Sequence, residues 1–452
     1  MSRDRHGQVM TDTGAAAVLH YEKALEELLF FREEVAGQAG AVLEASPRSV
    51  MGQVLKAYLG LLGTEEKDAA RAAEAFGVFR REVSVEGLTA RERMHLEAAS
   101  AWLAGDMHRA GRVLGDLVVA HPRDVLALAV GHQIDFFTGD AVLLRDRIGG
   151  VLASWDRDDP HYGLLQGMYA FGLEEAGHYT LAEQVGLEAV ERNARDVWGI
   201  HAVVHAYEMQ GRHEDGIGYL DARRQDWSSG NYLNVHNWWH YALYLLETGD
   251  TGAVLAVYDA ALHHEGSAGA AMELLDASAL LWRLYLAGGD TGGRWEVLAR
   301  AWAGRQDGPH YAFNDVHAVM AYVGAGRIGD AERLIGAREV WLGEAGAGVS
   351  NAAMTARIGL PVCRALVAYG QRRYAQAVGL LLPVRRCLQE FGGSHAQRDA
   401  LQKTLVEAAL RAGEDDLGRT LLSERLALRS RCPYNQRAWA RLAARGPGGT
   451  AG

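Results

Sequence analysis

The sequence predicts an all-α protein, a superhelical array of about nine tetratricopeptide-like helix–turn–helix repeats curved or closed around a polar lumen. Three observations predict it. A short turn built on glycine recurs every 34 to 44 residues. An apolar stretch with helical character precedes and follows each turn. Strand signals are nearly absent, and the chain of 452 residues holds only 8 prolines.

The elements are expected in the following order. Residues 1–14 are polar and lack an apolar signal core, so we expect them to be disordered. Residues 15–445 form one tetratricopeptide-like solenoid, because glycine suits the left-handed conformation that ends a helix. Residues 446–452 form a disordered tail. The turns are expected at Gly105, Gly139, Gly177, Gly211, Gly249, Gly289, Gly326, Gly370 and Gly413.

Composition narrows the class of protein. The chain is 49% hydrophobic and 23% charged, which is typical of a soluble globular protein. A net charge of -11 argues against nucleic-acid binding, and no apolar run is long enough for a membrane span. Its three cysteines form no CxxC pair, which favours a cytoplasmic location and argues against a thiolate metal site.

Two neighbouring repeats carry paired histidines. His201 and His205 lie four residues apart, as do His236 and His240, so each pair shares one helix face. Glu208 joins the first pair's stripe. Because buried polar groups need hydrogen-bonding partners, we expect these residues to bind a polar ligand.

Ionisable residues recur at similar depth on the helix that precedes each of six successive turns. In tetratricopeptide arrays these helices line the concave face, which predicts a lumen that binds a small molecule. Besides the histidine pairs and Glu208, the ligand-binding candidates are His132, Asp135, Tyr169, Asp276, Arg283, Asn314 and His317, with Glu174 and Asp315 in the same stripes and Trp239 as a pocket wall.

The stretches around these residues resemble the tetratricopeptide repeat protein 38 family. They include residues 167–175, 201–212, 238–240, 275–283, 313–317 and 393–399, and they spread over residues 160–400. The resemblance implies a soluble α-helical repeat protein. It supplies no activity, but the best-matching segments are the polar ones.

Three interpretations of the histidines stay open. His201, His205, His236 and His240 could bind one divalent ion such as zinc, iron or manganese. Alternatively, His201, His205, Glu208, His240 and Asp315 could be catalytic residues in acid–base chemistry, with the pairs His205–Glu208, His240–Asp276 or Asp315–His317. In the third interpretation, each histidine hydrogen-bonds a neighbouring helix and is purely structural.

Other segments also have both a functional and a structural interpretation. Arg283 could clamp an anionic group or form an ion pair with Asp276. Residues 223–234 could be a lid or a plain connection between repeats. Ser394 is expected to cap the helix that begins with His395. No nucleophile motif and no phosphate-binding loop occurs, so nothing predicts ATP, NAD or flavin.

Two functions follow from these readings. The first is an enzyme that acts on a small molecule by acid–base or metal-assisted chemistry. The Ala-, Gly- and Arg-rich composition of the chain is typical of a GC-rich bacterial genome, which is compatible with a role in secondary metabolism. The alternative is a non-catalytic scaffold for a protein or peptide partner.

Overall fold

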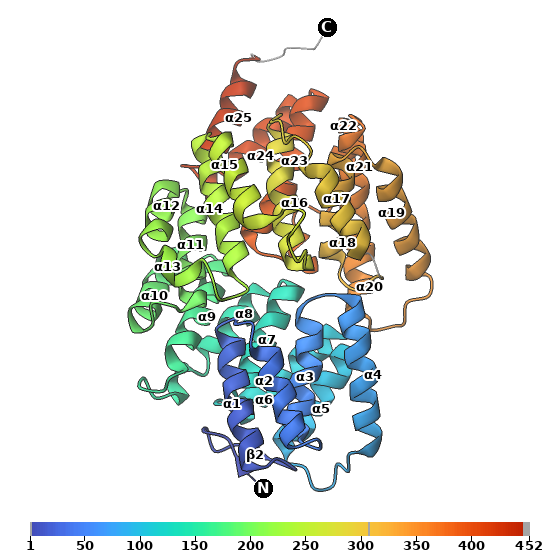
Figure 1. Ribbon diagram of the computed structural model, residues 1–452. Helices are drawn as coiled ribbons and strands as arrows, with labels where there is room; N and C mark the ends of the chain where they lie inside the picture. Colours follow the sequence, from blue (N-terminus) through green and yellow to red (C-terminus); the bar gives the residue numbers. More distant parts are fainter. Residues whose placement is uncertain (1, 306–307, 446–452) are drawn as a thin grey trace. The chain divides into compact units, whose positions relative to one another are not determined.

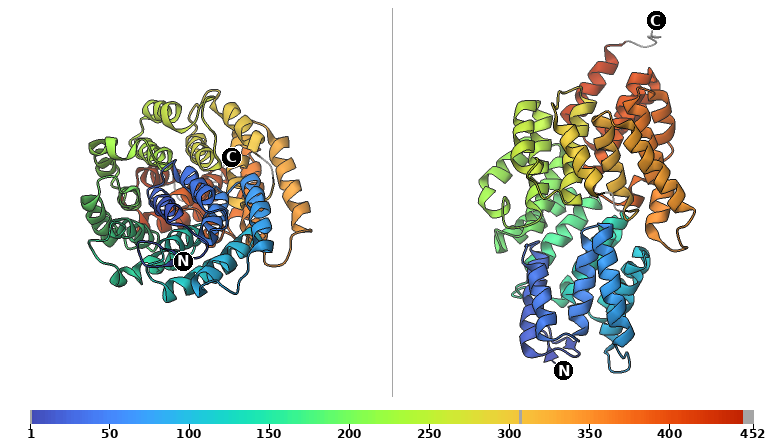
Figure 2. Two further views of the ribbon diagram at one scale, coloured as in Figure 1. Left: turned by 60° about the horizontal axis from the view of Figure 1, so that its bottom comes forward. Right: turned by 45° about the vertical axis from the view of Figure 1, so that its right-hand side comes forward.

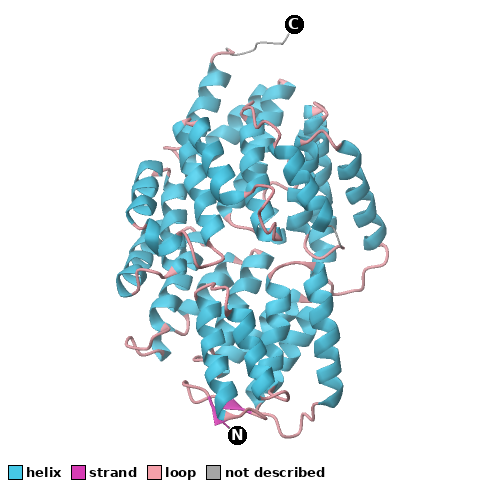
Figure 3. Cartoon of the chain, viewed as in Figure 1, coloured by secondary structure: helices cyan, strands magenta, loops and turns pink. Residues whose placement is uncertain are grey.

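The all-α prediction is confirmed by a computed structural model, which describes residues 2–305 and 308–445. Helices make up nearly all of the regular structure in this part of the chain (Figures 1 and 3). The exception is a two-residue antiparallel pair, β1 (Ser2–Arg3) with β2 (Val9–Met10), in which Ser2 stands opposite Met10. The helices follow one another as antiparallel hairpins of the tetratricopeptide type.

The chain divides into two compact units. Unit 1 consists of residues 2–203, 225–234 and 346–351, and unit 2 consists of residues 204–224, 235–345 and 352–445. Helix α11 (Val197–Gln210) contains the boundary between residues 203 and 204. The single continuous solenoid over residues 15–445 stays a prediction.

Unit 1 is built from hairpins that pack against the next hairpin in the chain, through α2 and α3, α6 and α7, and α8 and α9. Its helices are α1 (Ala15–Leu29), α2 (Val35–Ala45), α3 (Val50–Leu62), α4 (Glu66–Glu82), α5 (Ala90–Leu103), α6 (Met107–Ala120), α7 (Val125–Thr138), α8 (Ala141–Gly149), the 3-10 turn η1 (Leu152–Ser154), α9 (Tyr162–Glu175), α10 (Tyr179–Arg192), the first half of α11, and α13 (Arg224–Trp227).

Unit 2 repeats the arrangement, and α16, α17, α18 and α19 stand side by side in Figure 2 (yellow to orange). Its helices are the second half of α11, α12 (His213–Ala222), α14 (Asn234–Thr248) from residue 235 on, α15 (Thr251–Val257) with the π-helical turn η2 (Tyr258–Leu262), α16 (Ala271–Leu286), α17 (Arg294–Arg305), α18 (Ala312–Gly324), α19 (Ile328–Leu342), α20 (Ser350–Met354) from residue 352 on with the π-helical turn η3 (Thr355–Gly359), α21 (Leu360–Gly370), α22 (Tyr374–Leu381), the 3-10 turn η4 (Leu388–Phe391), α23 (His395–Ala412), α24 (Asp415–Leu428) and α25 (Pro433–Ala443).

Seven of the nine predicted glycine turns have the expected conformation. Gly105, Gly139, Gly177, Gly211, Gly249, Gly326 and Gly413 have φ values between 69° and 88°.

Two predicted turn positions are wrong. The left-handed residue is Gly288 rather than Gly289, and Arg372 rather than Gly370. Gly370 instead ends α21, where a Cβ atom would stand 2.3 Å from Cγ1 of Val323, so the glycine serves close helix packing.

Two hairpins near the N-terminus have no turn glycine in the left-handed position. Phe31 (φ 53°) lies between α1 and α2, and Thr64 (φ 56°) lies between α3 and α4. A search for glycine turns misses both, because a non-glycine residue takes the left-handed conformation only where tertiary packing offsets its cost.

The predicted disorder of residues 1–14 is also wrong for the described residues 2–14. Met10 is fully buried, and both the backbone N–H and the hydroxyl of Thr11 donate to the Glu92 carboxylate at 2.7 and 2.9 Å. Long-range contacts of this kind order a segment whose composition alone is polar. The predicted tail, residues 446–452, lies outside the described residues.

The core is apolar and rich in aromatic side chains. Trp227, Trp239 and Trp282 are fully buried, and Trp198, Trp295 and Trp302 are nearly so. The described helices include none that is long and apolar enough to cross a membrane.

Candidate functional site

Helices α11 and α14 position the paired histidines. Asp196 precedes α11, and its Oδ1 accepts a hydrogen bond of 2.9 Å from the Gly199 N–H, which is the geometry of an N-cap. In unit 2 the two helices are joined by the Tyr244 hydroxyl, which donates to the Val204 carbonyl at 2.5 Å. Small and apolar residues flank the histidines on both helices. Because these residues pack in the core, the imidazoles lie there as well.

His205, His236 and His240 form a buried cluster within unit 2. One ring nitrogen from each lies within 4.8 Å of the others. The ring centroids are 4.4 Å apart for His205 and His240, and 4.8 Å apart for His236 and His240. Their exposed fractions are 0%, 8% and 0%, so three imidazoles share one water-poor site.

Two carboxylates orient two of these imidazoles. The Nδ1 of His240 is 2.8 Å from Glu208 Oε2, and the Nδ1 of His236 is 2.8 Å from Asp276 Oδ2. A buried carboxylate accepts from the protonated Nδ1, and this assigns the Nε2 of each ring as the lone-pair nitrogen.

The histidine–carboxylate pairing differs from the sequence prediction. The expected pairs His205–Glu208 and His240–Asp276 are replaced by Glu208 with His240 and Asp276 with His236. Glu208 points toward the facing helix α14, where its Oε2 meets the His240 ring.

Charge and burial keep His240 neutral. Burial lowers its pKa well below the usual value, and His205, His236 and Arg283 lower it further because each would repel an imidazolium. A neutral imidazole is the form that binds a metal ion.

Trp239 and Arg283 pack on the cluster. The Trp239 ring stacks on His236, with centroids 5.1 Å and planes 19° apart, and the Arg283 guanidinium lies 5.3 Å from the Trp239 ring. Arg283 donates to the carbonyls of Ala279 and Ala396 at 2.8 and 2.5 Å. It therefore links α16 to α23, and its predicted role as an anion clamp stays a prediction.

His201 lies one turn before His205 on α11, on the unit 1 side of the boundary. Within unit 1 its ring packs on Phe171, with centroids 4.9 Å apart. Its predicted role as a catalytic residue or fourth metal ligand stays a prediction.

A charged network next to Glu208 was not predicted. Glu208 lines a cavity of about 20 Å³ together with Glu247 and Lys403, which form an ion pair at 2.9 Å. Lys403 also lies 3.4 Å from Asp399. The four-residue spacing of Asp399 and Lys403 is the only sequence signal, and it is common on solvated helices.

Each of the unit 1 candidates contacts a neighbouring helix, and their predicted role in ligand binding stays a prediction. The Nε2 of His132 is 3.1 Å from the Met168 carbonyl, and burial lowers its pKa to about 3. Asp135 accepts two hydrogen bonds from Arg147, at 2.6 and 2.8 Å. Tyr169 is half-buried and packs over Gly149. Together they join neighbouring helices.

The α18 candidates do not form the predicted acid–base pair. Asp315 accepts two hydrogen bonds from Arg338, at 2.9 and 2.8 Å, whereas His317 has its Nδ1 2.8 Å from the Phe313 carbonyl. Residues two apart on a helix face different directions, which explains the separation. Burial lowers the pKa of His317 to about 4, and Asn314 is half-buried in the first turn.

Two local predictions are resolved by the same structure. Ser394 caps α23 in a capping box with Gln397, as expected. The loop at 223–234 contains α13, and within unit 1 the Tyr232 N–H donates to the Phe31 carbonyl at 2.7 Å. This anchoring favours a fixed connection over a lid.

No protein-family profile matches the chain. Among solved structures, the chain is similar to the crystal structure of the APC/C hetero-tetramer Cut9–Hcn1, with 12% identity, a TM-score of 0.37, and coverage of 95% of this chain and 89% of that one. It is also similar to yeast Tom70, with 13% identity, a TM-score of 0.30, and coverage of 95% and 88%. The tetratricopeptide-like fold therefore rests on the hairpins themselves, and the resemblance to the tetratricopeptide repeat protein 38 family stays an expectation.

Proposed function

We propose that this repeat protein binds one divalent transition-metal ion in unit 2 through His205, His236 and His240. The observation that carries the proposal is the convergence of three buried imidazoles whose nitrogens lie within 4.8 Å of one another. Nitrogen ligands of a tetrahedral ion stand about 3.4 Å apart, given metal–nitrogen bonds of about 2.0–2.1 Å. Binding would therefore require nitrogens at the 4.8 Å limit of the cluster to approach one another by about 1.4 Å.

The carboxylates support the same proposal. Metal-binding histidines commonly donate their second ring nitrogen to a carboxylate, which fixes the ring and raises its basicity. Glu208 and Asp276 have this relation to His240 and His236. An ion would therefore bind through Nε2 of both rings, and zinc, iron and manganese all accept imidazole.

The proposed activity is metal-assisted chemistry on a small molecule. Three imidazole ligands leave a coordination position for water or substrate, and a bound divalent ion lowers the pKa of water toward about 7.

Elemental analysis of the tag-free protein by plasma mass spectrometry tests the metal proposal. We expect about one equivalent of zinc, iron or manganese in the wild type and a loss of that metal in His205→Ala and His240→Ala. Asp276→Asn should weaken metal binding about 10- to 100-fold. The matched control is His317→Ala, which removes a buried histidine of the same unit and should leave the metal content unchanged.

Circular dichroism on each variant separates lost ligands from lost folding. A folded wild type that takes up none of the three metals after reconstitution would contradict the proposal. The histidines would then serve acid–base chemistry or the structural network.

A protein- or peptide-binding scaffold is the second candidate, favoured by a groove in unit 1. The groove has a volume of about 550 Å³, with apolar Leu96 and Val85 beside Arg80 and Arg93. Its lining also contains Asp106 and Glu97, and Glu97 pairs with Arg109 at 3.0 Å. It suits a peptide that carries both acidic and apolar side chains. Fluorescence anisotropy with such peptides should lose its signal in an Arg80→Ala/Arg93→Ala variant, and equal binding by that variant would contradict the groove as the site.

A further inference from the structure

A second group of potential metal ligands lies in unit 1, where the N-terminal hairpin meets the loop before α9. His6 lies in the turn between β1 and β2, and Asp159 and His161 lie just before α9 begins at Tyr162. One ligand atom of each of the three residues lies within 4.8 Å of the other two. Because 155 positions separate His6 from His161 in the chain, only the fold brings them together.

The sequence of the hairpin positions His6. The Oδ1 of Asp4 accepts hydrogen bonds from the backbone N–H of His6 at 3.0 Å and of Gln8 at 2.9 Å. Gly7 has a φ of 78°, which lets the chain turn back at this point. The His6 side chain is only 3% exposed, and its ring meets Trp155 edge-on with the centroids 5.0 Å apart. The imidazole is therefore held against the helices of unit 1 rather than in solvent.

The distances among the three side chains suit a metal ion. The Nε2 of His6 is 3.3 Å from the Nδ1 of His161, and the Nδ1 of His6 is 3.5 Å from Asp159 Oδ2. The ligand atoms of a tetrahedral ion stand about 3.4 Å apart. Burial lowers the pKa of both histidines, that of His161 to about 4, so both imidazoles are neutral and able to bind a metal at neutral pH.

One cation, Arg123, already lies beside these groups. Its Nη2 is 3.2 Å from Asp159 Oδ2 and 3.3 Å from His6 Nδ1. The Arg123 side chain is 41% exposed, and an ion pair with an exposed partner contributes little stability. The guanidinium can therefore turn into solvent when a divalent ion takes its place. Arg5, the other arginine that acts on the charge of His6, is paired with Glu22 at 3.7 Å.

We propose that His6, Asp159 and His161 bind a second divalent transition-metal ion, such as zinc, which fastens the N-terminal hairpin to the loop before α9. Two imidazoles and one carboxylate suit zinc and leave a fourth position for water. Because the ion must displace Arg123, it exchanges readily and is lost during purification. The one equivalent of metal expected for the histidine cluster of unit 2 is therefore unchanged.

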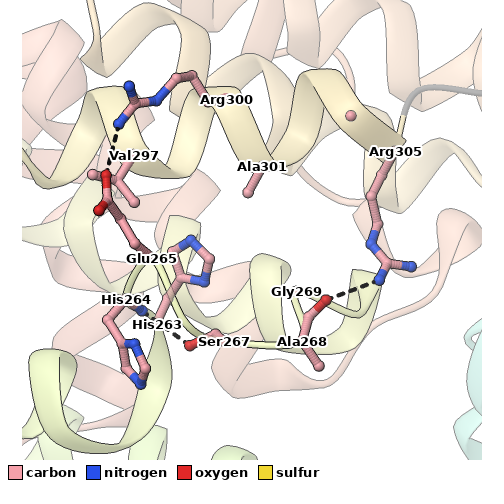
Figure 4. Close-up of a pocket in the computed structure, with 11 residues that line it drawn as sticks. His263, His264, Glu265, Ser267, Ala268, Gly269, Val297, Arg300, Ala301 and Arg305 are labelled. Atoms are coloured by element: carbon pink, nitrogen blue, oxygen red, sulfur yellow. Dashed lines mark hydrogen bonds and ion pairs between the residues drawn. The ribbon is translucent and has the colours of Figure 1, made fainter.

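Calorimetric titration of the full chain with zinc chloride tests the proposal. We expect one equivalent of zinc whose binding depends on His161, and His161→Ala should weaken it at least about tenfold. Arg123→Met should strengthen the same binding, because it removes the competing cation and keeps every ligand. The control for adventitious surface binding is His264→Ala, since His264 is exposed and lies beside Glu265 at another pocket (Figure 4). It should leave this equivalent unchanged.

Limited digestion with trypsin gives a readout that is local to the hairpin. Zinc should slow cleavage after Arg5 in the wild type and in the matched unit 1 control His20→Ala, but not in His161→Ala. Three results would each overturn the proposal: equal zinc binding by His161→Ala and the wild type, no gain in affinity in Arg123→Met, or a cleavage rate at Arg5 that zinc does not change. The Arg123→Met result decides the matter even if His161→Ala fails to fold. None of these results depends on the metal content of the histidine cluster.

Discussion

Replacing Asp196 by asparagine should stabilise the protein at alkaline pH and leave it nearly unchanged at acid pH. Asp196 is fully buried and caps α11, the helix that carries His201, His205 and Glu208. Its Oδ2 has no hydrogen-bond partner among the described residues. Asparagine keeps an oxygen for the Gly199 N–H and carries no charge, so the cap survives while the ionisation is removed.

The magnitude follows from the pKa of Asp196. Burial raises it from 3.8 to about 7, although the backbone N–H groups of Gly199 and Trp198 oppose the increase. Because the folded state holds the proton more tightly, the contribution is complete below pH 3.8 and is lost as the pH rises through 7. At about 1.36 kcal/mol per pH unit, the wild type loses about 4 kcal/mol from this group between pH 4 and pH 8.

Urea unfolding at pH 4 and pH 8, followed by tryptophan fluorescence, measures this difference. The free energy of unfolding of Asp196→Asn relative to wild type should rise by up to about 4 kcal/mol between the two conditions. Asp124 is the matched control, because it caps α7 through the Ala127 N–H and contacts Arg91 and His95. Burial opposes ionisation of Asp124, but the Arg91 guanidinium and the hydrogen bond with His95 outweigh it and hold the pKa of Asp124 well below its usual value. Asp124→Asn should therefore destabilise the protein at pH 8.

Two results would refute this reasoning. A difference between Asp196→Asn and wild type that is the same at pH 4 and pH 8 would mean that the Asp196 pKa is not raised by folding. A destabilised Asp196→Asn at both pH values would mean that the carboxylate makes a favourable contact as an anion.

Two further predictions concern packing and ion pairing. Arg338→Met should destabilise the protein by about 3–5 kcal/mol because it leaves the Asp315 carboxylate buried without its cation, and an added Asp315→Leu should restore most of the loss in the same unfolding assay. Gly172→Ala should destabilise by about 1–3 kcal/mol or more, because the new Cβ would stand 2.5 Å from the Arg145 Cα, and thermal unfolding would contradict this if the midpoint rose.

The helical hairpins were predictable from the sequence because their main signal is local. Gly139 ends α7 with φ 69°, and the glycine in the sequence is enough to predict that turn. The turn at Arg372 could not be found in this way, since its left-handed conformation is set by the helices on either side. Gly370, two residues earlier, is required for close packing against Val323 and not for its backbone angle.

The residues of the candidate site were predictable from the sequence, whereas the pairing of its histidines with carboxylates was not. The four-residue spacing predicted His236 and His240 on one face of α14, and a ring nitrogen of each lies within 4.8 Å of one from His205. Spacing carries no information about which carboxylate of another helix reaches which ring. Asp276 is 40 residues from His236 and still lies 2.8 Å from its Nδ1.

By itself, the sequence determined the all-α class, most hairpin turns and the histidine stripes, because helical periodicity and glycine conformation depend on residues within a few positions of one another. Only the tertiary structure decided that Glu208 contacts His240 and that Asp315 pairs with Arg338. These contacts depend on the side chains that neighbouring helices present to one another, and that arrangement is set by packing across the whole hairpin rather than by any local pattern.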